Sequence, residues 1–237
     1  MIFKYVQYVA IGSALLSGCF WVREGNGHRV RETRELPEFS RIDVDGSFDV
    51  TVEQGEQSSV RVSIDSNLIR FVRTHVVGDT LHIDSAESLH AEVSGPHVSV
   101  VTPRLERASL TGSGLLVLRA IEGDEPLELE LDGSGDVSFE GSAPEISVRV
   151  DGSGTVALAG ETERVVLRLS GSGEIDAEAL DASRGTIDLE GSGDIAATVH
   201  DEVDVSLAGS GNIDLYGGAD IAGMSHSGSG DVQQHSR

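Results

Sequence analysis

Seven Gly-Ser-Gly tripeptides are the most regular feature of the sequence that could carry chemistry. A serine can act as a nucleophile, but it needs an activating base within reach, and no histidine recurs at a fixed offset from these serines. The tripeptides also differ from phosphate-binding loops, because no Lys-Ser or Lys-Thr follows them. We therefore interpret them as structural turns. They begin at Gly112, Gly133, Gly152, Gly171, Gly191, Gly209 and Gly228, at spacings of 21, 19, 19, 20, 18 and 19 residues.

Acidic residues beside the tripeptides suggest a second chemistry. If equivalent turns lie one above another, the flanking side chains form two ladders of oxygen atoms, which are the ligands that calcium takes. The alternative is that Asp and Asn favour the flanks of turns without any metal, and Thr155, Ser170 and Ala208 interrupt the ladders. The sequence leaves calcium as a candidate cofactor and predicts no other. The candidate calcium ligands are Asp132, Asp136, Asp151, Glu190 and Asp194.

The residues on both sides of each tripeptide alternate between apolar and polar. Leu127, Leu129 and Leu131 precede one tripeptide, and Val137 and Phe139 follow it, with polar residues between them. A period of two indicates strands, so each repeat consists of a strand, a tight turn and a strand with one apolar face. One such repeat cannot bury enough surface to fold alone, whereas stacked repeats share a continuous core.

This stacking predicts an all-β fold, a parallel β-solenoid (right-handed β-helix) of about 19-residue coils with Gly-Ser-Gly corners. Sharp corners that lie directly over one another need positive φ or close backbone approach, and glycine allows both. We expect this role for Gly112, Gly114, Gly133, Gly135, Gly152, Gly154, Gly171, Gly173, Gly191, Gly193, Gly209, Gly211, Gly228 and Gly230.

The first half of the folded body carries the same pattern in a less regular form. Asp45-Gly46-Ser47 lies between alternating apolar residues like a degenerate tripeptide, and Gly78-Asp79 is expected to close a hairpin. Asp65-Ser66-Asn67 is expected to cap one short helix near residues 68–73.

These patterns predict one domain. We expect a single β-solenoid over residues 38–237, with irregular coils at 38–104 and regular Gly-Ser-Gly repeats at 105–237. The coil from Ser225 onward is polar, which predicts an open sheet edge that resists pairing with another chain.

The N-terminus has the features of an export signal. Residues 1–18 start with a positive charge at Lys4 and continue with an apolar run too short to span a bilayer. Leu16-Ser17-Gly18-Cys19 resembles the bacterial lipoprotein signal box, which implies cleavage before Cys19 and a lipid on that residue. Cys19 is the only cysteine of the chain. An ordinary signal peptide with a chance cysteine is the alternative.

The residues after the cysteine bear on the final location. By resemblance to enterobacterial sorting rules, Phe20 in place of an aspartate favours the outer membrane over inner-membrane retention. Residues 19–37 are polar, with four arginines and no regular period, and we interpret them as a lipidated tether. The expected contact with the membrane is therefore the lipid on Cys19.

Charge and composition exclude some functions. The formal net charge is −23, and Lys4 is the only lysine, so nucleic acid is not an expected partner. Aromatic residues make up 4% of the chain, which argues against stacking platforms for bases or sugars. The eight histidines show no metal-ligand spacing.

The order of short motifs resembles one known family. Phe39-Ser40-Arg41-Ile42, Gly78-Asp79-Thr80-Leu81 and the repeated Gly-Ser-Gly-Asp/Asn-Ile, clearest at 191–195 and 209–213, are similar to the "putative auto-transporter adhesin, head GIN domain" family, also called domain of unknown function 2807 (DUF2807). The resemblance covers about residues 39–234. It implies a β-solenoid on a secreted or lipid-anchored bacterial protein, and it brings no catalytic motif.

These observations favour a non-enzymatic, lipid-anchored cell-envelope protein with an adhesion or protein-display role, whose partner is an envelope protein or a surface glycan. Two alternatives remain open from sequence. One is a carbohydrate-binding or polysaccharide-cleaving β-helix protein, by analogy of fold alone. The other is a calcium-stabilised partner in envelope assembly.

Overall fold

The computed structural model describes residues 22–92 and 95–235. Over these residues 74% of the chain is strand, with one short 3-10 helix, η1 (Ile69–Phe71). The strands are β1 (Val22–Glu24), β2 (Arg29–Arg34), β3 (Arg41–Gly46), β4 (Asp49–Gln54), β5 (Ser59–Asp65), β6 (Val72–Val77), β7 (Thr80–Ser85), β8 (Ser88–His90), β9 (His97–Thr102), β10 (Arg107–Gly112), β11 (Leu115–Glu122), β12 (Leu127–Gly133), β13 (Asp136–Gly152), β14 (Thr155–Gly171), β15 (Glu174–Gly191), β16 (Asp194–Gly209), β17 (Asn212–Tyr216), β18 (Asp220–Gly228) and β19 (Asp231–Gln234).

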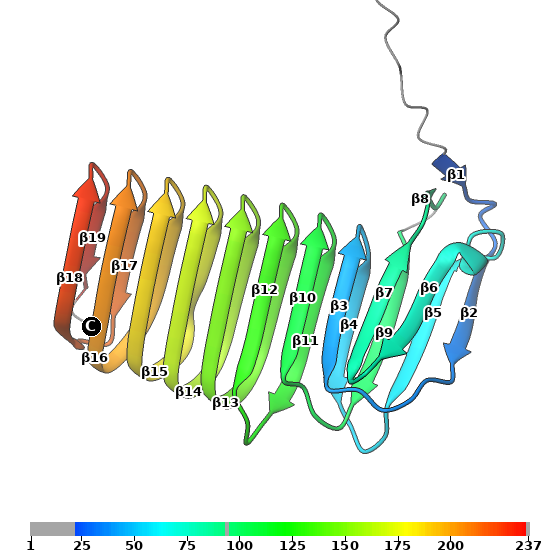
Figure 1. Cartoon of the computed structure of the whole chain (residues 1–237), viewed down its shortest axis with the longest axis horizontal. Coiled ribbons are helices and arrows are strands. Elements are labelled where there is room, and N and C mark those ends of the chain that lie inside the picture. The colour runs from blue at the N-terminus through cyan, green and yellow to red at the C-terminus, as the bar shows by residue number, and fades with distance from the viewer. Residues whose placement is uncertain (1–21, 93–94, 236–237) are drawn as a thin grey trace, which may run out of the picture.

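The regular half is a column of stacked coils (Figure 1). Each of β13, β14, β15 and β16 runs from one Gly-Ser-Gly corner to the next, and each pairs in parallel with the strand before and after it. Parallel pairing follows from the repeat, because equivalent strands of successive coils run in the same direction. The column has about seven turns of about 19 residues, which confirms the predicted β-solenoid.

The core consists of layers of apolar side chains, one layer from each coil. Val148, Leu167, Ile187 and Val205 are successive register partners, and each is at most 3% exposed. Along each strand these buried positions alternate with exposed or half-buried ones, as the period of two predicted. The two apolar faces of each coil therefore meet in one continuous core.

Differences in coil length are absorbed away from the corners. β13 and β14 both have 17 residues and pair without a shift. β15 has 18 residues, and its register against β14 shifts between Ala157 and Ala159. β16 has 16 residues, and its register against β15 shifts between Ala177 and Asp181. The corners thus stay in register although their spacing varies.

The N-terminal end adds one coil and then closes the column. β3 pairs in parallel with β10, and β4 with β11, so Gly46, with φ of 121°, begins the row of corners. Beyond this coil, β7 pairs with β3 and β9 with β4. Antiparallel strands follow, with β6 on β7, β5 on β9 and β2 on β5 (Figure 1).

Two local predictions for this end need correction. Residues 29–34, interpreted as part of a tether, form β2, because its backbone pairs with β5 along its full length. The predicted short helix near 68–73 forms as the 3-10 helix η1, but no side chain caps it, so the predicted cap is wrong. Asp65 instead accepts hydrogen bonds from the backbone N–H groups of Gly27 and Glu92, and so holds two loops together. The predicted hairpin at Gly78 forms between β6 and β7.

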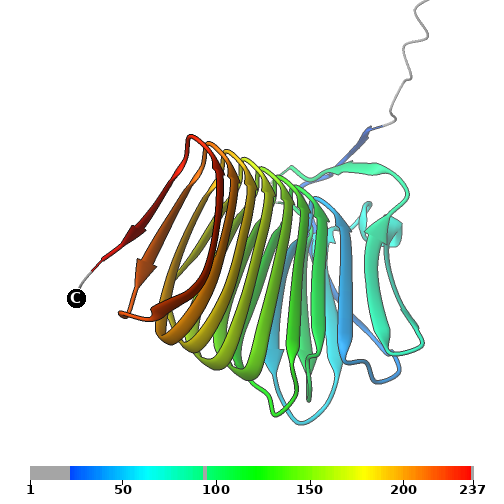
Figure 2. The ribbon, with the colours of Figure 1, turned by 60° about the vertical axis from the view of Figure 1, so that its left-hand side comes forward.

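The C-terminal end has no comparable closure in the part of the chain that the structure describes. β18 pairs with β16, and β19 pairs with β17, each along one edge. Figure 2 shows this last coil standing at the end of the column, opposite the antiparallel strands of the N-terminal half.

Candidate functional site

The stacked corners form a spine along one side of the column. The first glycine of every tripeptide has φ between 120° and 140°, a region that favours glycine. The second glycine is required for a different reason. A Cβ on Gly154 would lie 2.3 Å from the carbonyl oxygen of Gly135 in the coil before it. The predicted structural role of these glycines therefore has a specific geometric basis at both positions.

Backbone hydrogen bonds join each corner to the previous one. The N–H of Ser153 donates to the carbonyl oxygen of Gly133 at 2.9 Å, and the N–H of Thr155 donates to that of Gly135 at 3.1 Å. The serine hydroxyls lie on the outside, where Ser47 and Ser113 hydrogen-bond each other at 3.0 Å. These contacts support a structural role for the corner serines.

The candidate calcium ligands lie beside the spine, as expected, but several of their carboxylates have cationic or uncharged side chains as neighbours. Asp151 accepts a hydrogen bond from Arg149 Nε at 2.8 Å, and Asp194 Oδ1 accepts one from Asn212 Nδ2 at 2.8 Å. The register pairs are Asp132 with Asp151, Asp136 with Thr155, Glu190 with Ser170 and Ala208, and Asp194 with Glu174 and Asn212.

This arrangement offers calcium few ligands at any one place. Calcium takes six to eight oxygen atoms, whereas within residues 22–92 and 95–235 no group of three or more His, Cys, Asp or Glu side chains could hold a metal ion. Thermal melting with and without a chelator tests the sequence prediction directly, because a ligand bound to the folded state raises the midpoint. We expect the midpoint to stay unchanged.

The predicted lipidation site, Cys19, lies outside the described residues, as do residues 1–18. Within the described part, the structure contains no helix that is both long and apolar enough to cross a membrane. The first described strand, β1, pairs with β8 near the N-terminal end of the column (Figure 1).

One hollow in the described part of the chain was not predicted. It has a volume of about 760 Å³ and lies between the β1–β8 pair and the corner that joins β3 to β4. Pockets of 300–1,000 Å³ are typical of small-ligand sites. Charged and hydroxyl side chains supply most of its polar groups, and Phe48, Leu89 and Pro96 supply apolar surface. The polar residues are Arg23, Asp45, Ser47, Ser85, Ser88 and Glu87.

An ion pair fixes the rim of this cavity. Arg23 on β1 donates a hydrogen bond to Glu87, which precedes β8. The guanidinium of Arg23 also lies 5.0 Å from the centre of the Phe71 ring. The hydrogen bond from Arg23 lowers the pKa of Glu87. Sequence reasoning missed this site because β1 has only three residues, too few to show a period.

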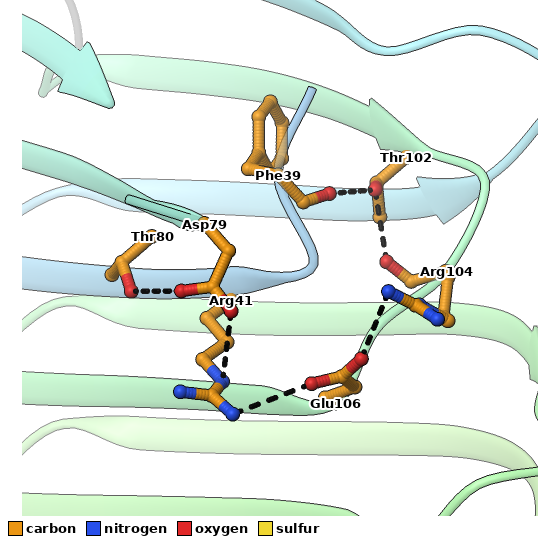
Figure 3. A network of polar contacts seen from close by, with 7 residues as sticks. All are labelled: Phe39, Arg41, Asp79, Thr80, Thr102, Arg104 and Glu106. Atoms are coloured by element: carbon orange, nitrogen blue, oxygen red, sulfur yellow. Dashed lines mark hydrogen bonds and ion pairs between the residues drawn. The ribbon is translucent and has the colours of Figure 1, made fainter. Parts of the chain in front are cut away.

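A polar network joins the N-terminal half to the regular coils (Figure 3). Arg41 reaches Asp79 at 3.7 Å and Glu106 at 3.4 Å, and Arg104 reaches Glu106 at 3.1 Å. Three segments that are far apart in the sequence thus meet at one point. The side chains of Arg41, Asp79 and Arg104 are about half exposed, so the network contributes little stability by charge alone.

One buried threonine stabilises the same junction. Thr102 is fully buried, and its Oγ1 lies 2.8 Å from the carbonyl oxygen of Phe39 and 2.9 Å from that of Arg104 (Figure 3). Thr162 repeats this arrangement within the regular coils, where its Oγ1 lies 2.8 Å from the Ala143 carbonyl oxygen. A hydroxyl at this place satisfies carbonyl groups that leave the strand ladder.

His235, near the C-terminus, has structural partners. His235 Nε2 lies 2.6 Å from Asp214 Oδ1, and its ring stacks on Tyr216 with centroids 4.7 Å apart. Loss of solvent raises the pKa of Tyr216, and the carboxylates of Glu178 and Asp214 add to this rise. The contacts hold the end of β19 against β17.

The family comparison agrees with this architecture. The family model described as "Putative auto-transporter adhesin, head GIN domain" (DUF2807) matches residues 38–219. No curated protein matches the chain.

Solved structures from Bacteroides and Parabacteroides species share the fold. A "putative adhesin" from Bacteroides fragilis is 19% identical, with a TM-score of 0.81 over 90% of this chain and all of the other. A "putative lipid binding protein" from Parabacteroides distasonis is 23% identical, with a TM-score of 0.76 over 91% of this chain and all of the other. At these identities the likeness shows the fold alone.

Proposed function

The chain belongs to the "Putative auto-transporter adhesin, head GIN domain" family, and we propose that it is a non-enzymatic adhesin of the cell envelope, anchored by a lipid on Cys19. The family supports an adhesin-like protein at the cell surface or in the envelope. The Leu16-Ser17-Gly18-Cys19 box supports the anchor, and Phe20 supports the outer membrane as the location.

The observation that carries this proposal is the position of β1. Cys19 precedes Val22, the first residue of β1, by three positions, and β1 lies at the N-terminal end of the column (Figure 1). An anchor there would hold the column by one end and present its length and its far end to a partner. The continuous parallel pairing makes the column a stiff spacer, because each coil is fixed by the next.

Labelling tests the anchor, and adhesion tests the function. Cells that express the chain are grown with labelled palmitate, and we expect label on the wild type and none on Cys19→Ser. Deletion of the gene should reduce attachment of the cells to host or bacterial surfaces, and wild-type protein should restore it. Unlabelled wild-type protein would contradict the anchor, and unchanged attachment after deletion would contradict the adhesin role.

The cavity beside β1 favours a second candidate function, binding of a surface glycan. Its lining combines hydroxyl and charged groups with apolar surface, which suits a polyhydroxylated ligand. Titration calorimetry with oligosaccharides from the cell envelope tests this function. The double variant Asp45→Asn/Arg23→Ala should lose binding. The control variant Ser172→Ala, which changes a corner far from the cavity, should keep it. Absence of heat with the wild type would reject glycan binding at this cavity.

A further inference from the structure

The last coil leaves the column open at its C-terminal end. In the described residues, the parallel partners of β18 and β19 lie on one side only, at β16 and β17. The other edge of each strand therefore presents backbone N–H and C=O groups without a strand partner. Such an edge pairs readily with a strand of another chain.

The side chains of this coil also lack a covering layer. Met224 and His226 occupy the inward register positions above Val205 and Leu207, which are at most 3% exposed. Met224 itself is 53% exposed, and Ile221 in the same strand is 37% exposed. The core thus reaches the end of the column with apolar groups in contact with water.

Features that normally protect an edge are scarce here. Proteins block open edges with lysine, proline, bulges or charges that point inward. β18 and β19 contain no lysine, no proline and no arginine, and their charged residues are Asp220 and Asp231. One bulge occurs at Ala222, and the strand is regular from Gly223 to Gly228. The polar composition predicted an edge that resists pairing, and the structure shows that polarity is nearly its only protection.

Charge indicates which partner fits this end. The chain carries a formal charge of −23, so two copies repel each other over most of their surface. β15 alone contains six carboxylates and one arginine, whereas β18 and β19 together contain two carboxylates. The C-terminal end is therefore where two copies of this chain meet with little repulsion.

The geometry of the coil also suits a second copy. A two-fold axis perpendicular to the column places both strands of one end antiparallel to strands of the other copy, so both sheets continue across the contact. A foreign partner would need two strands at the same separation. One coil of about 19 residues per side is close to the 20–30 residues of a standard protein interface.

From these observations we propose that the open C-terminal end is a self-association surface, through which two copies stack end to end with antiparallel pairing of β18 and β19. Where the N-terminal end is anchored, as proposed above, this surface lies at the far end of the column and joins copies on facing membranes. The self-association itself does not depend on the anchor.

Sedimentation velocity tests the proposal on the full-length chain, extracted in a mild non-ionic detergent. The concentration runs from about 1 to 100 µM, which brackets the micromolar affinities of weak complexes. We expect the wild type to shift from monomer to dimer over this range. Met224→Asp with Val232→Asp should weaken the dimer by about tenfold or more, because the charges point into the contact.

Two further proteins serve as controls. Val77→Asp changes a side chain that is 61% exposed at the opposite end, and should dimerise like the wild type. Cys19→Ser should also dimerise, so loss of the anchor and loss of self-association give different results. A wild type that stays monomeric at the highest concentration would overturn the proposal, even if another envelope protein binds this end. Dimers that survive in the double variant would overturn it as well.

Discussion

At the N-terminal end of the column the two sheets finish on β6 and β2, which run antiparallel to their neighbours, whereas at the C-terminal end they finish on a coil like those beneath it. β2 carries three arginines and a glutamate among its six residues, so its free edge is strongly charged. β18 carries one carboxylate. A repeat that stacks well on its neighbours does not end the column by itself. Within the described residues, the column is closed only where the sequence departs from the repeat.

The largest expected effect is at the corner spine, where a Gly→Ala substitution should destabilise an interior coil more than the first coil. Gly152→Ala forces positive φ on alanine and places its Cβ 2.3 Å from the carbonyl oxygen of Gly133. Gly46→Ala also meets a positive φ, of 121°, but the nearest atom is Phe48 Cε2 at 3.2 Å. We expect losses of about 4 kcal/mol for Gly152→Ala and about 1–3 kcal/mol for Gly46→Ala in urea unfolding. Equal losses would show that the corners do not stack closely.

The next largest effect is in the core, where truncating a side chain should cost more stability in the middle of the column than in the last coil. Leu167→Ala removes a fully buried side chain from the middle of the column and should cost about 3 kcal/mol. Met224→Ala changes a half-exposed side chain in the last coil and should cost less than about 0.5 kcal/mol in the monomer. Thermal unfolding at low protein concentration measures both. A large loss for Met224→Ala would mean that the last coil is as well packed as the interior.

Replacing the buried threonine should cost a similar amount of stability in the N-terminal half and in the regular coils. Thr102→Val and Thr162→Val each leave a carbonyl oxygen of a neighbouring segment without its hydroxyl partner. We expect each to cost about 1–3 kcal/mol, because an unsatisfied buried carbonyl keeps its desolvation penalty. Chemical unfolding of the two variants, beside the wild type, compares them. A neutral Thr102→Val would indicate that the junction does not depend on this contact.

The smallest expected effect concerns pH at the cavity rim. The pKa of Glu87 is lowered by the hydrogen bond from Arg23. A carboxyl group with a lowered folded-state pKa stabilises the fold above its unfolded pKa, and this contribution is lost as the pH falls through the folded value. The protection factors of the β1 and β8 amides, which correct for the intrinsic pH dependence of exchange, should therefore fall on acidification in the wild type. Glu87→Gln should remove this pH dependence, and a persistent acid response would assign it to another group.

The sequence was sufficient for the regular half because one chemical constraint recurs in it. Gly152 and its equivalents must be glycine at every corner, and Leu167 and its equivalents must be apolar, so both patterns are visible without a structure. Gly46 was found by the same pattern in the degenerate first coil.

The N-terminal closure could not be predicted in the same way. β2 is charged and largely exposed, so its strand forms through backbone pairing with β5, which leaves no apolar period. Asp65 resembles a helix cap by its neighbours, yet the loops at Gly27 and Glu92 supply its partners from distant parts of the chain. The cavity depends on the same long-range contacts, because β1 and β8 are separated by more than sixty residues.

Hydrogen exchange measured coil by coil on the dilute monomer tests the central difference between the two ends most directly. Opening of a packed element requires loss of the contacts on both sides, so protection should be highest in β13 to β15 and should fall sharply at β18 and β19. The closed end should be intermediate, with β5 and β7 more protected than β18. Protection at β18 and β19 equal to that of β14, or fraying of β7 before β18, would contradict the account of one closed and one open end.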